Sequence, residues 1–266
     1  MTNPEDRWKT QSDLVTELAN ILSRCLVPLF TGSPKGKPQF IGTSFLVSSS
    51  AHHYLVSAAH VFDHGTDGSE LWYYIEPMLT QKLWGKLHRT TLSDAGTRKN
   101  DRFDVGVLEI TGGLLPPYPK VGRYPMPLNC LQSNVTPREG KQYLVFGFPG
   151  TKHRLDPINK EVTSELCIYR THSADQSSYE KLGVQESTHI VMAFDREKSV
   201  GPDGKIHSFP KPFGMSGSPV WLLIDEEGPN DNAIPPIVGV VIEYHKVHRA
   251  ILATDIGAAL GVMGGA

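Results

Sequence analysis

The chain has 266 residues, of which 39% are hydrophobic and 20% are charged, and its formal net charge is −2 at pH 7. This length is sufficient for a large hydrophobic core, either in one domain or in two compact halves of one unit. The nearly balanced charge argues against a nucleic-acid or anionic-membrane surface, so we expect protein or peptide partners, no nucleic acid and no membrane.

The first ten residues are acidic and polar, whereas a secretory signal requires a basic start followed by an apolar run. No segment approaches the roughly 20 consecutive apolar residues of a membrane-spanning helix. The three cysteines, Cys25, Cys130 and Cys167, are odd in number, lie far apart and show no metal-ligand spacing. We therefore expect no disulfide framework, no metal, no cofactor and a reducing, cytoplasmic location.

Residues 12–26 have the apolar periodicity of one amphipathic helix. Apolar side chains recur there at steps of three and four, and a serine suited to the N-cap precedes them. These positions are Ser12, Leu14, Leu18, Ile21, Leu22 and Cys25. We treat residues 1–26 as a helical extension that covers the folded domain or docks on a partner.

After this helix the sequence changes to short segments rich in β-branched and aromatic residues, separated by clusters of Gly, Pro, Ser and Asn. Strands are predicted at 39–47, 54–57, 71–75, 104–110, 143–148, 189–194 and 237–244, and a short closing helix at 255–262. Such a succession of short strands is typical of an all-β barrel or sandwich.

Three less regular segments separate these elements. Residues 112–127 contain five prolines, which resist central strands, and form the best candidate for a connection between two halves. Residues 195–212 are polar, include a Pro-Asp-Gly turn and lead directly to a serine motif. The basic run at 98–102 is interrupted by an aspartate, so we interpret it as a solvated loop.

Three segments carry the residue types of nucleophilic catalysis. Ser-Ala-Ala-His-Val contains His60, Asp-Val-Gly-Val-Leu begins at Asp104, and Gly-Met-Ser-Gly-Ser-Pro-Val contains Ser216. A serine hydroxyl is a poor nucleophile at neutral pH, so it requires a base such as histidine and a carboxylate that orients this base. We therefore predict Ser216 as the nucleophile, His60 as the base and Asp104 as the orienting group.

These segments, in the order His, Asp, Ser, resemble the signatures of trypsin-like (chymotrypsin-fold) serine peptidases, particularly compact bacterial ones. The resemblance implies two packed antiparallel Greek-key β-barrels, with an N-terminal and a short C-terminal helix and with the site between the barrels. Residues 27–118 would form the first barrel, with His60 and Asp104, and residues 119–266 the second, with Ser216. The N–H groups of Gly214 and Ser216 would form the oxyanion hole.

The same resemblance implies that the strand 237–244 pairs with the extended substrate backbone. Ile242, Glu243 and Tyr244 would then edge the specificity pocket, and Phe213 would stand on its opposite wall. Glu243 suggests a basic side chain in the substrate.

One position departs from the family pattern. Digestive relatives have an aspartate where Met215 stands, and that aspartate pairs with a newly cut N-terminus. We therefore expect no activation by N-terminal trimming. Control by the long loop before the serine, or by a partner protein, is expected instead.

The prediction is thus a serine endopeptidase that forms an acyl-enzyme on a restricted intracellular protein substrate. One alternative is a protease-fold module that binds peptides without catalysis. Another is an α/β-hydrolase esterase with Asp225 or Asp231 as the acid and His245 as the base, although its nucleophile turn requires Gly where Ser218 stands.

Overall fold

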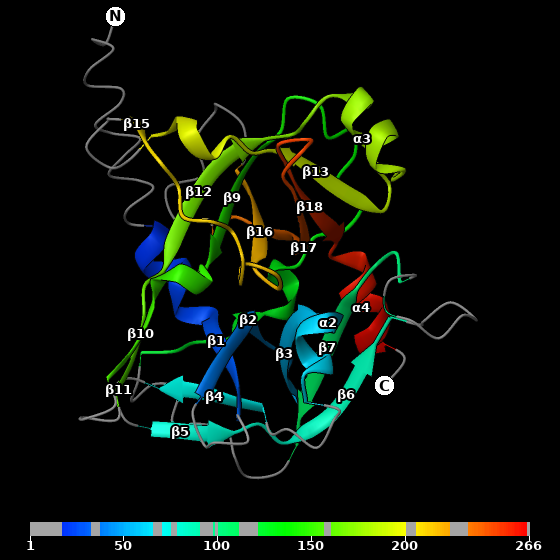
Figure 1. Cartoon of the computed structure of the whole chain (residues 1–266). Coiled ribbons are helices and arrows are strands. Elements are labelled where there is room, and N and C mark those ends of the chain that lie inside the picture. The colour runs from blue at the N-terminus through cyan, green and yellow to red at the C-terminus, as the bar shows by residue number, and fades with distance from the viewer. Residues whose placement is uncertain are drawn as a thin grey trace, which may run out of the picture.

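The computed structural model describes residues 18–32, 38–65, 71–75, 79–90, 98, 101–111, 122–156, 161–200, 206–223 and 234–264. Two curled, largely antiparallel sheets dominate these residues, one in the lower and one in the upper part of Figure 1. No helix among them is long and apolar enough to cross a membrane.

The first sheet has the strand order β5-β4-β1-β2-β3-β7-β6, and β8 adds to β2 in parallel. The strands are β1 (Leu26–Gly32), β2 (Pro38–Ser48), β3 (His53–Ala58), β4 (Leu71–Ile75), β5 (Leu79–Lys82), β6 (Gly85–Arg89), β7 (Val105–Ile110) and β8 (Met126–Pro127). Phe45 on β2 pairs with Val56 on β3, which pairs with Val107 on β7, and all three side chains are fully buried. This cross-strand row fixes the register of the strands that precede the predicted histidine and follow the predicted aspartate.

The second sheet has the strand order β12-β9-β16-β17-β18-β13. Its strands are β9 (Gln142–Gly147), β12 (Cys167–His172), β13 (His189–Ala193), β16 (Pro219–Leu223), β17 (Ile237–His245) and β18 (Ala250–Asp255). An antiparallel bridge between Ser173 and Met192 brings the two ends of the sheet together. Two small hairpins lie apart from it: β10 (His153–Asp156) with β11 (Glu161–Ser164), and β14 (Ser199–Val200) with β15 (Ile206–His207).

The helices are short and lie at the ends of strands. They are α2 (Ala59–Asp63), α3 (Gln176–Leu182) and α4 (Gly257–Gly264), with 3-10 turns η1 (Ser23–Cys25), η4 (Leu128–Cys130), η5 (Gly150–Lys152) and η6 (Arg196–Lys198). Residues 18–22 are also helical, whereas residues 12–17 of the predicted N-terminal helix lie outside the described residues. The predicted closing helix begins two residues later than expected, because Asp255 ends β18 and its Oδ1 accepts a hydrogen bond of 2.8 Å from the Gly257 N–H.

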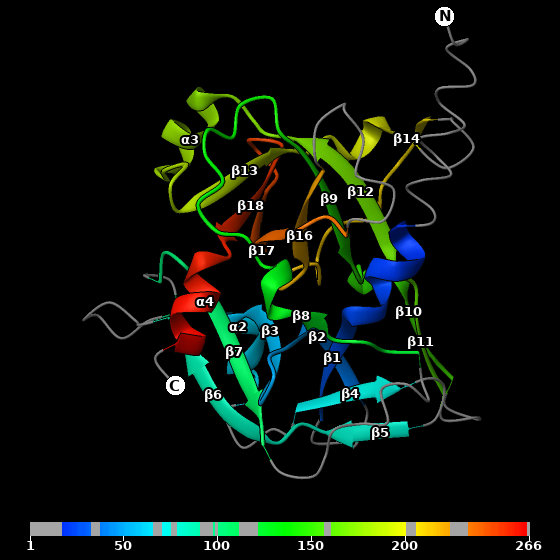
Figure 2. The ribbon, with the colours of Figure 1, turned by 180° about the vertical axis from the view of Figure 1, so that it is seen from behind.

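One hydrophobic cluster lies between the sheets. It includes Phe45 and Val56 from the first sheet and Phe146 and Trp221 from the second, together with Met263 of α4. Figure 2 shows α4 beside β7 and β6 of the first sheet, although the helix follows β18 of the second. The two halves therefore share one core.

The all-β prediction of two sheets is confirmed, and each predicted strand is present within one or two residues of its expected bounds. Of the strands of the two sheets, β1, β5, β6, β8, β12, β16 and β18 were not predicted, and neither were the two small hairpins. The boundary between residues 118 and 119 stays a prediction, and β8, which follows it, pairs with the first sheet.

Candidate active site

His60 lies on α2, the single helical turn that directly follows β3. Ala59, Val61 and Phe62 are buried in the core, while the imidazole of His60 remains 38% exposed. A Cβ at Gly106 would meet the Phe62 ring at 2.6 Å, so glycine at this position of β7 allows the strand to pass beneath the helix. The Asp-Val-Gly-Val run thus has a packing role beside its chemical one.

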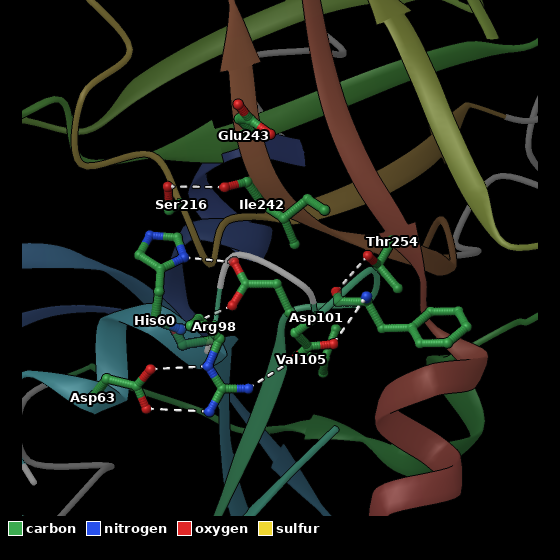
Figure 3. Close-up of polar contacts among 12 residues, drawn as sticks. His60, Asp63, Arg98, Asp101, Val105, Ser216, Ile242, Glu243 and Thr254 are labelled. Carbon is green, nitrogen blue, oxygen red and sulfur yellow. Dashed lines mark hydrogen bonds and ion pairs between the residues drawn. The ribbon is translucent and has the colours of Figure 1, made fainter. Parts of the chain in front are cut away.

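Asp104 stands just before β7 with a backbone φ of 46°, and its carboxylate binds His60 twice. The His60 N–H donates to Oδ1 at 2.9 Å, and Nδ1 lies 2.5 Å from Oδ2 (Figure 3). The Asp104 carbonyl also accepts a hydrogen bond of 2.7 Å from the Ala59 N–H. Because a carboxylate accepts hydrogen bonds, the proton of the neutral imidazole is held on Nδ1 and Nε2 is left as an acceptor.

Ser216 lies in the loop before β16, next to the helix that carries His60. A Cβ at Gly42 would stand 2.8 Å from Val61 of α2 and 3.2 Å from the Ser216 carbonyl oxygen, so both segments meet at β2. Figure 3 draws Ser216 on the side of the imidazole that faces away from the carboxylate. Among the described residues, the Ser216 hydroxyl donates to the Ile242 carbonyl at 3.4 Å and makes no hydrogen bond to His60.

The turn around Ser216 requires glycine on both sides. Gly214 has a φ of 90° and Gly217 a φ of 88°, in the region that side-chain-bearing residues rarely adopt. A Cβ on Gly214 would overlap the Phe40 ring, and one on Gly217 would overlap the Thr43 carbonyl oxygen. Sterics therefore require glycine at positions 214 and 217 of the turn.

Thr43 on β2 of the first sheet holds this turn of the second half. Its N–H donates to the Ser216 carbonyl at 3.0 Å, and its hydroxyl donates to the Gly214 carbonyl at 2.9 Å. The same hydroxyl accepts a hydrogen bond of 3.0 Å from the Phe148 N–H. Hydrogen bonds of this kind fix the position of Ser216 relative to α2 without any contact to its own side chain.

The peptide group between Phe213 and Gly214 is fixed by a hydrogen bond of 2.6 Å from the Gly150 N–H to the Phe213 carbonyl. In a trans peptide the N–H points opposite to the carbonyl, so the Gly214 N–H points away from Gly150. Within the described part of the chain, neither this N–H nor that of Ser216 donates a hydrogen bond. Both are therefore free to bind an acceptor beside the hydroxyl.

The predicted substrate-binding residues lie at this loop and on β17. Phe213 is 70% exposed, whereas Ile242 is buried. The Glu243 side chain is 60% exposed and its Oε2 lies 3.2 Å from Nε2 of His245. Tyr244 packs against Phe194, with 5.2 Å between the ring centroids. Tyr244 thus belongs partly to the core.

The strand β17 pairs with β18 along one edge, whereas its opposite edge is paired over only part of its length. Val240 pairs with Pro219 of β16, but from Ile242 onward no described strand pairs with this edge. A register shift between Val241 and Glu243 on the β18 side reorients the strand here. The result, among the described strands, is an unpaired backbone edge next to Ser216.

Two features of the site were not predicted from the sequence. Thr43 belongs to a predicted strand, but only its contacts across the two halves identify its role. The interpretation of residues 98–102 as a solvated loop is wrong for two of them, because Asp101 is buried and Arg98 bridges it to Asp63. Asp63 lies 35 positions before Arg98, so no local pattern in the sequence indicates their contact.

Of the acid and base residues of the esterase alternative, only His245 lies within the described residues. His245 pairs with Glu243 rather than with a member of the Ser216 region, and Asp225 and Asp231 lie outside the described residues. Within the described ranges, no three His, Cys, Asp or Glu side chains converge as a metal site would require.

Comparison with known proteins supports the fold. No protein-family model matches the chain, and no curated protein matches its sequence. Among solved structures, it is similar to neuropsin, a serine protease expressed in the limbic system of mouse brain, with a TM-score of 0.57 and 12% sequence identity. The similarity covers 91% of this chain and 94% of neuropsin. At this identity the similarity concerns the fold alone.

Proposed function

We propose that this chain, which has the two-sheet fold of trypsin-like serine proteases, is a serine endopeptidase that uses Ser216, His60 and Asp104. The observation that carries the proposal is the double hydrogen bond from His60 to the Asp104 carboxylate. This contact fixes both the orientation and the tautomer of the imidazole, which are the two properties that a base for serine requires.

In the proposed reaction the Ser216 hydroxyl first rotates from the Ile242 carbonyl to Nε2 of His60. His60 takes the proton as Oγ attacks the substrate carbonyl, and Asp104 stabilises the imidazolium that forms. The imidazolium then protonates the leaving amine, so the peptide bond breaks and an acyl-enzyme remains. A water molecule, deprotonated by the same imidazole, hydrolyses the ester and restores the hydroxyl.

The free N–H groups of Gly214 and Ser216 supply the proposed oxyanion hole. Because Gly150 fixes the Phe213 carbonyl, the Gly214 N–H is oriented before any substrate binds. Removal of one such donor typically lowers turnover by about 100- to 1000-fold. Met215 is buried beside the turn, which supports a site assembled without the ion pair to a cut N-terminus.

The proposed substrate is an extended peptide segment that adds to the unpaired edge of β17. Ile242, Glu243 and Tyr244 would contact it on one side, and the exposed ring of Phe213 on the other. We propose a restricted protein substrate, such as a dedicated partner protein. The three free cysteines are consistent with the proposed reducing, cytoplasmic location.

The proposal is tested by covalent labelling with a fluorophosphonate probe. Wild type should be labelled, and Ser216→Ala should not, because the labelled oxygen is removed. Ser218→Ala is a matched control, since the Ser218 hydroxyl is buried, and it should be labelled as wild type is. Equal labelling of the Ser216→Ala variant would refute Ser216 as the nucleophile.

A peptide-binding module without catalysis is the second candidate, and the hydrogen bond from Ser216 to Ile242 favours it. Peptide binding in the absence of labelling and turnover would support this function. Hydrolysis of simple esters but of no peptide in a broad library would support the esterase instead.

A further inference from the structure

Two aspartates outside the proposed triad lie on the two segments that carry His60 and Asp104. Asp63 is the last residue of α2, one turn after His60, and Asp101 lies three positions before Asp104. Arg98 binds both of them (Figure 3). Its Nε and Nη2 donate to the two oxygens of Asp63 at 2.8 and 3.3 Å, and its Nη1 donates to Asp101 at 2.6 Å.

Asp101 shapes the loop that leads to Asp104. Its carboxylate accepts hydrogen bonds from the Thr90 hydroxyl at 2.7 Å and from the Phe103 N–H at 3.1 Å. The Thr90 hydroxyl in turn accepts a hydrogen bond of 3.1 Å from the Val105 N–H. These bonds enclose Asp104 and support its left-handed backbone conformation.

The charges of this bridge are partly buried, so their pairing matters more than that of surface ions. Burial alone would raise the pKa of Asp63, but the hydrogen bonds from Arg98 and Arg89 outweigh it and lower the pKa. Burial likewise opposes ionisation of Asp101, and the bonds from Thr90 and Arg98 lower its pKa. Both groups are therefore carboxylates, and loss of Arg98 would leave the buried charge of Asp101 without its cation.

The second half of the molecule holds the opposite side of the same loop. The Thr254 hydroxyl donates to the Phe103 carbonyl at 2.6 Å, and Nε2 of His189 lies 2.8 Å from the Arg102 carbonyl. Thr254 and His189 belong to β18 and β13 of the second sheet. The loop thus lies between the second sheet on one side and Arg98 on the other.

From these contacts we infer that Arg98 is a positioning residue, which holds α2 and the loop before β7 together so that Asp104 reaches both the backbone N–H and Nδ1 of His60. The inference rests on the proposed function for its effect on catalysis, but its structural part does not. Misplacement of a catalytic group by about 1 Å costs about 100-fold in rate, so a bridge of this kind would affect turnover without touching the substrate.

The test compares Arg98→Ala with Arg89→Ala. Arg89 also binds Asp63, at 2.5 Å, but it forms no ion pair with Asp101, so its loss removes the same charge and leaves the bridge intact. In protein with ¹⁵N-labelled histidine, the Nδ1–H proton of His60 should give a far-downfield NMR resonance. We expect this resonance to broaden or vanish in Arg98→Ala and to persist in Arg89→Ala.

Kinetics provide the second measurement. Arg98→Ala should lower kcat by about 10- to 100-fold with little change in KM, because the base moves and the peptide-binding edge does not. Arg98→Lys should recover only part of kcat, since a single ammonium cannot bind both carboxylates as the planar guanidinium does. Equal losses in Arg98→Ala and Arg89→Ala, or an unchanged resonance in Arg98→Ala, would overturn the inference.

The experiment also separates this inference from the proposed function. The resonance can be measured in a Ser216→Ala background, where no turnover is possible, so it reports on Arg98 even if the chain is not a peptidase. If Arg98→Ala does not fold, Asp63→Asn provides a milder break of the same bridge, and its resonance should broaden in the same way. A sharp, unshifted resonance in folded Asp63→Asn would refute the bridge.

Discussion

His60 and Asp104, which lie beside strands of the first sheet, are held by charged and polar side chains. Ser216, in the second half, is held by hydrogen bonds to the backbone of its turn and by two glycine positions at which a Cβ would not fit. In the first region a carboxylate binds the imidazole, and Arg98 secures the loop behind it. In the second region, Thr43 and the glycines at 214 and 217 define the turn. We therefore expect the first region to be sensitive to charge and the second to be sensitive to added volume.

Gly217→Ala should have the largest effect, because it adds a methyl group to the turn around Ser216 and changes no charge. The added Cβ would overlap the Thr43 carbonyl, and alanine is strained at a φ of 88°. We expect probe labelling to be lost and the free energy of unfolding to fall by more than about 2 kcal/mol. Urea unfolding and labelling measure both.

Gly261→Ala is the matched control for this substitution. Apart from its own helix, no heavy atom of the described residues lies within 4 Å of the Cβ position of Gly261 in α4, so alanine should leave labelling intact and leave stability unchanged or slightly raised. Wild-type labelling of Gly217→Ala would contradict the steric argument for the turn.

Asp104→Asn should disturb the first region through the loss of one negative charge and not through a change of volume, because asparagine and aspartate have nearly the same size. The variant cannot stabilise the imidazolium of His60, so we expect kcat to fall by about 10⁴-fold, the order of magnitude of this change in a Ser-His-Asp triad. Stability should change much less than in Gly217→Ala. Peptide turnover and urea unfolding distinguish the two effects.

Asp175→Asn makes the same chemical change at the N-cap of α3, where asparagine also caps well, and should leave kcat unaffected. A loss of less than tenfold in Asp104→Asn would show that charge is not what this region requires.

The smallest expected effect is a pH dependence of the free energy of unfolding that arises from His153. This titratable residue packs behind the turn around Ser216. The ring stacks on Phe40, which lies against Gly214, and burial lowers the pKa of His153 to about 4. The unfolded chain takes up this proton near pH 6.5, so the free energy of unfolding should decrease as pH falls from about 6.5 to about 4.

His153→Phe should reduce this slope, which urea unfolding at several pH values measures. Because the ring is only partly buried, the effect should be smaller than the pKa difference alone implies. An identical pH slope in wild type and variant would exclude His153 as its source.

The sequence predicted those parts of the fold that have a local cause. Alternating or β-branched runs bounded by turn residues identified β2, β3, β7, β9 and β17. The strand β1 was missed because the apolar spacing of the preceding helix continues into it at Leu26. The strand β18 was missed because all six residues are buried and show no alternation.

The same distinction applies to the site. The proposed nucleophile, base and orienting aspartate were identified from short motifs, because the residue types themselves indicate the chemistry. Thr43 and the Asp63–Arg98–Asp101 bridge depend instead on which strands and loops meet in space. Those contacts follow from the register of the first sheet and its packing on the second half, so a single sequence without its fold does not indicate them.

The core shared by the two sheets has a consequence for motion. Phe45, Phe146, Trp221 and Met263 belong to one buried cluster, so rotation of one half against the other would expose large apolar surfaces to water. The two halves therefore do not open and close about a hinge. A substrate of the proposed peptidase would therefore be accommodated by the loops around Ser216 and by the unpaired edge of β17. Its selectivity would depend on which peptides those surfaces bind while the two sheets keep their relative position.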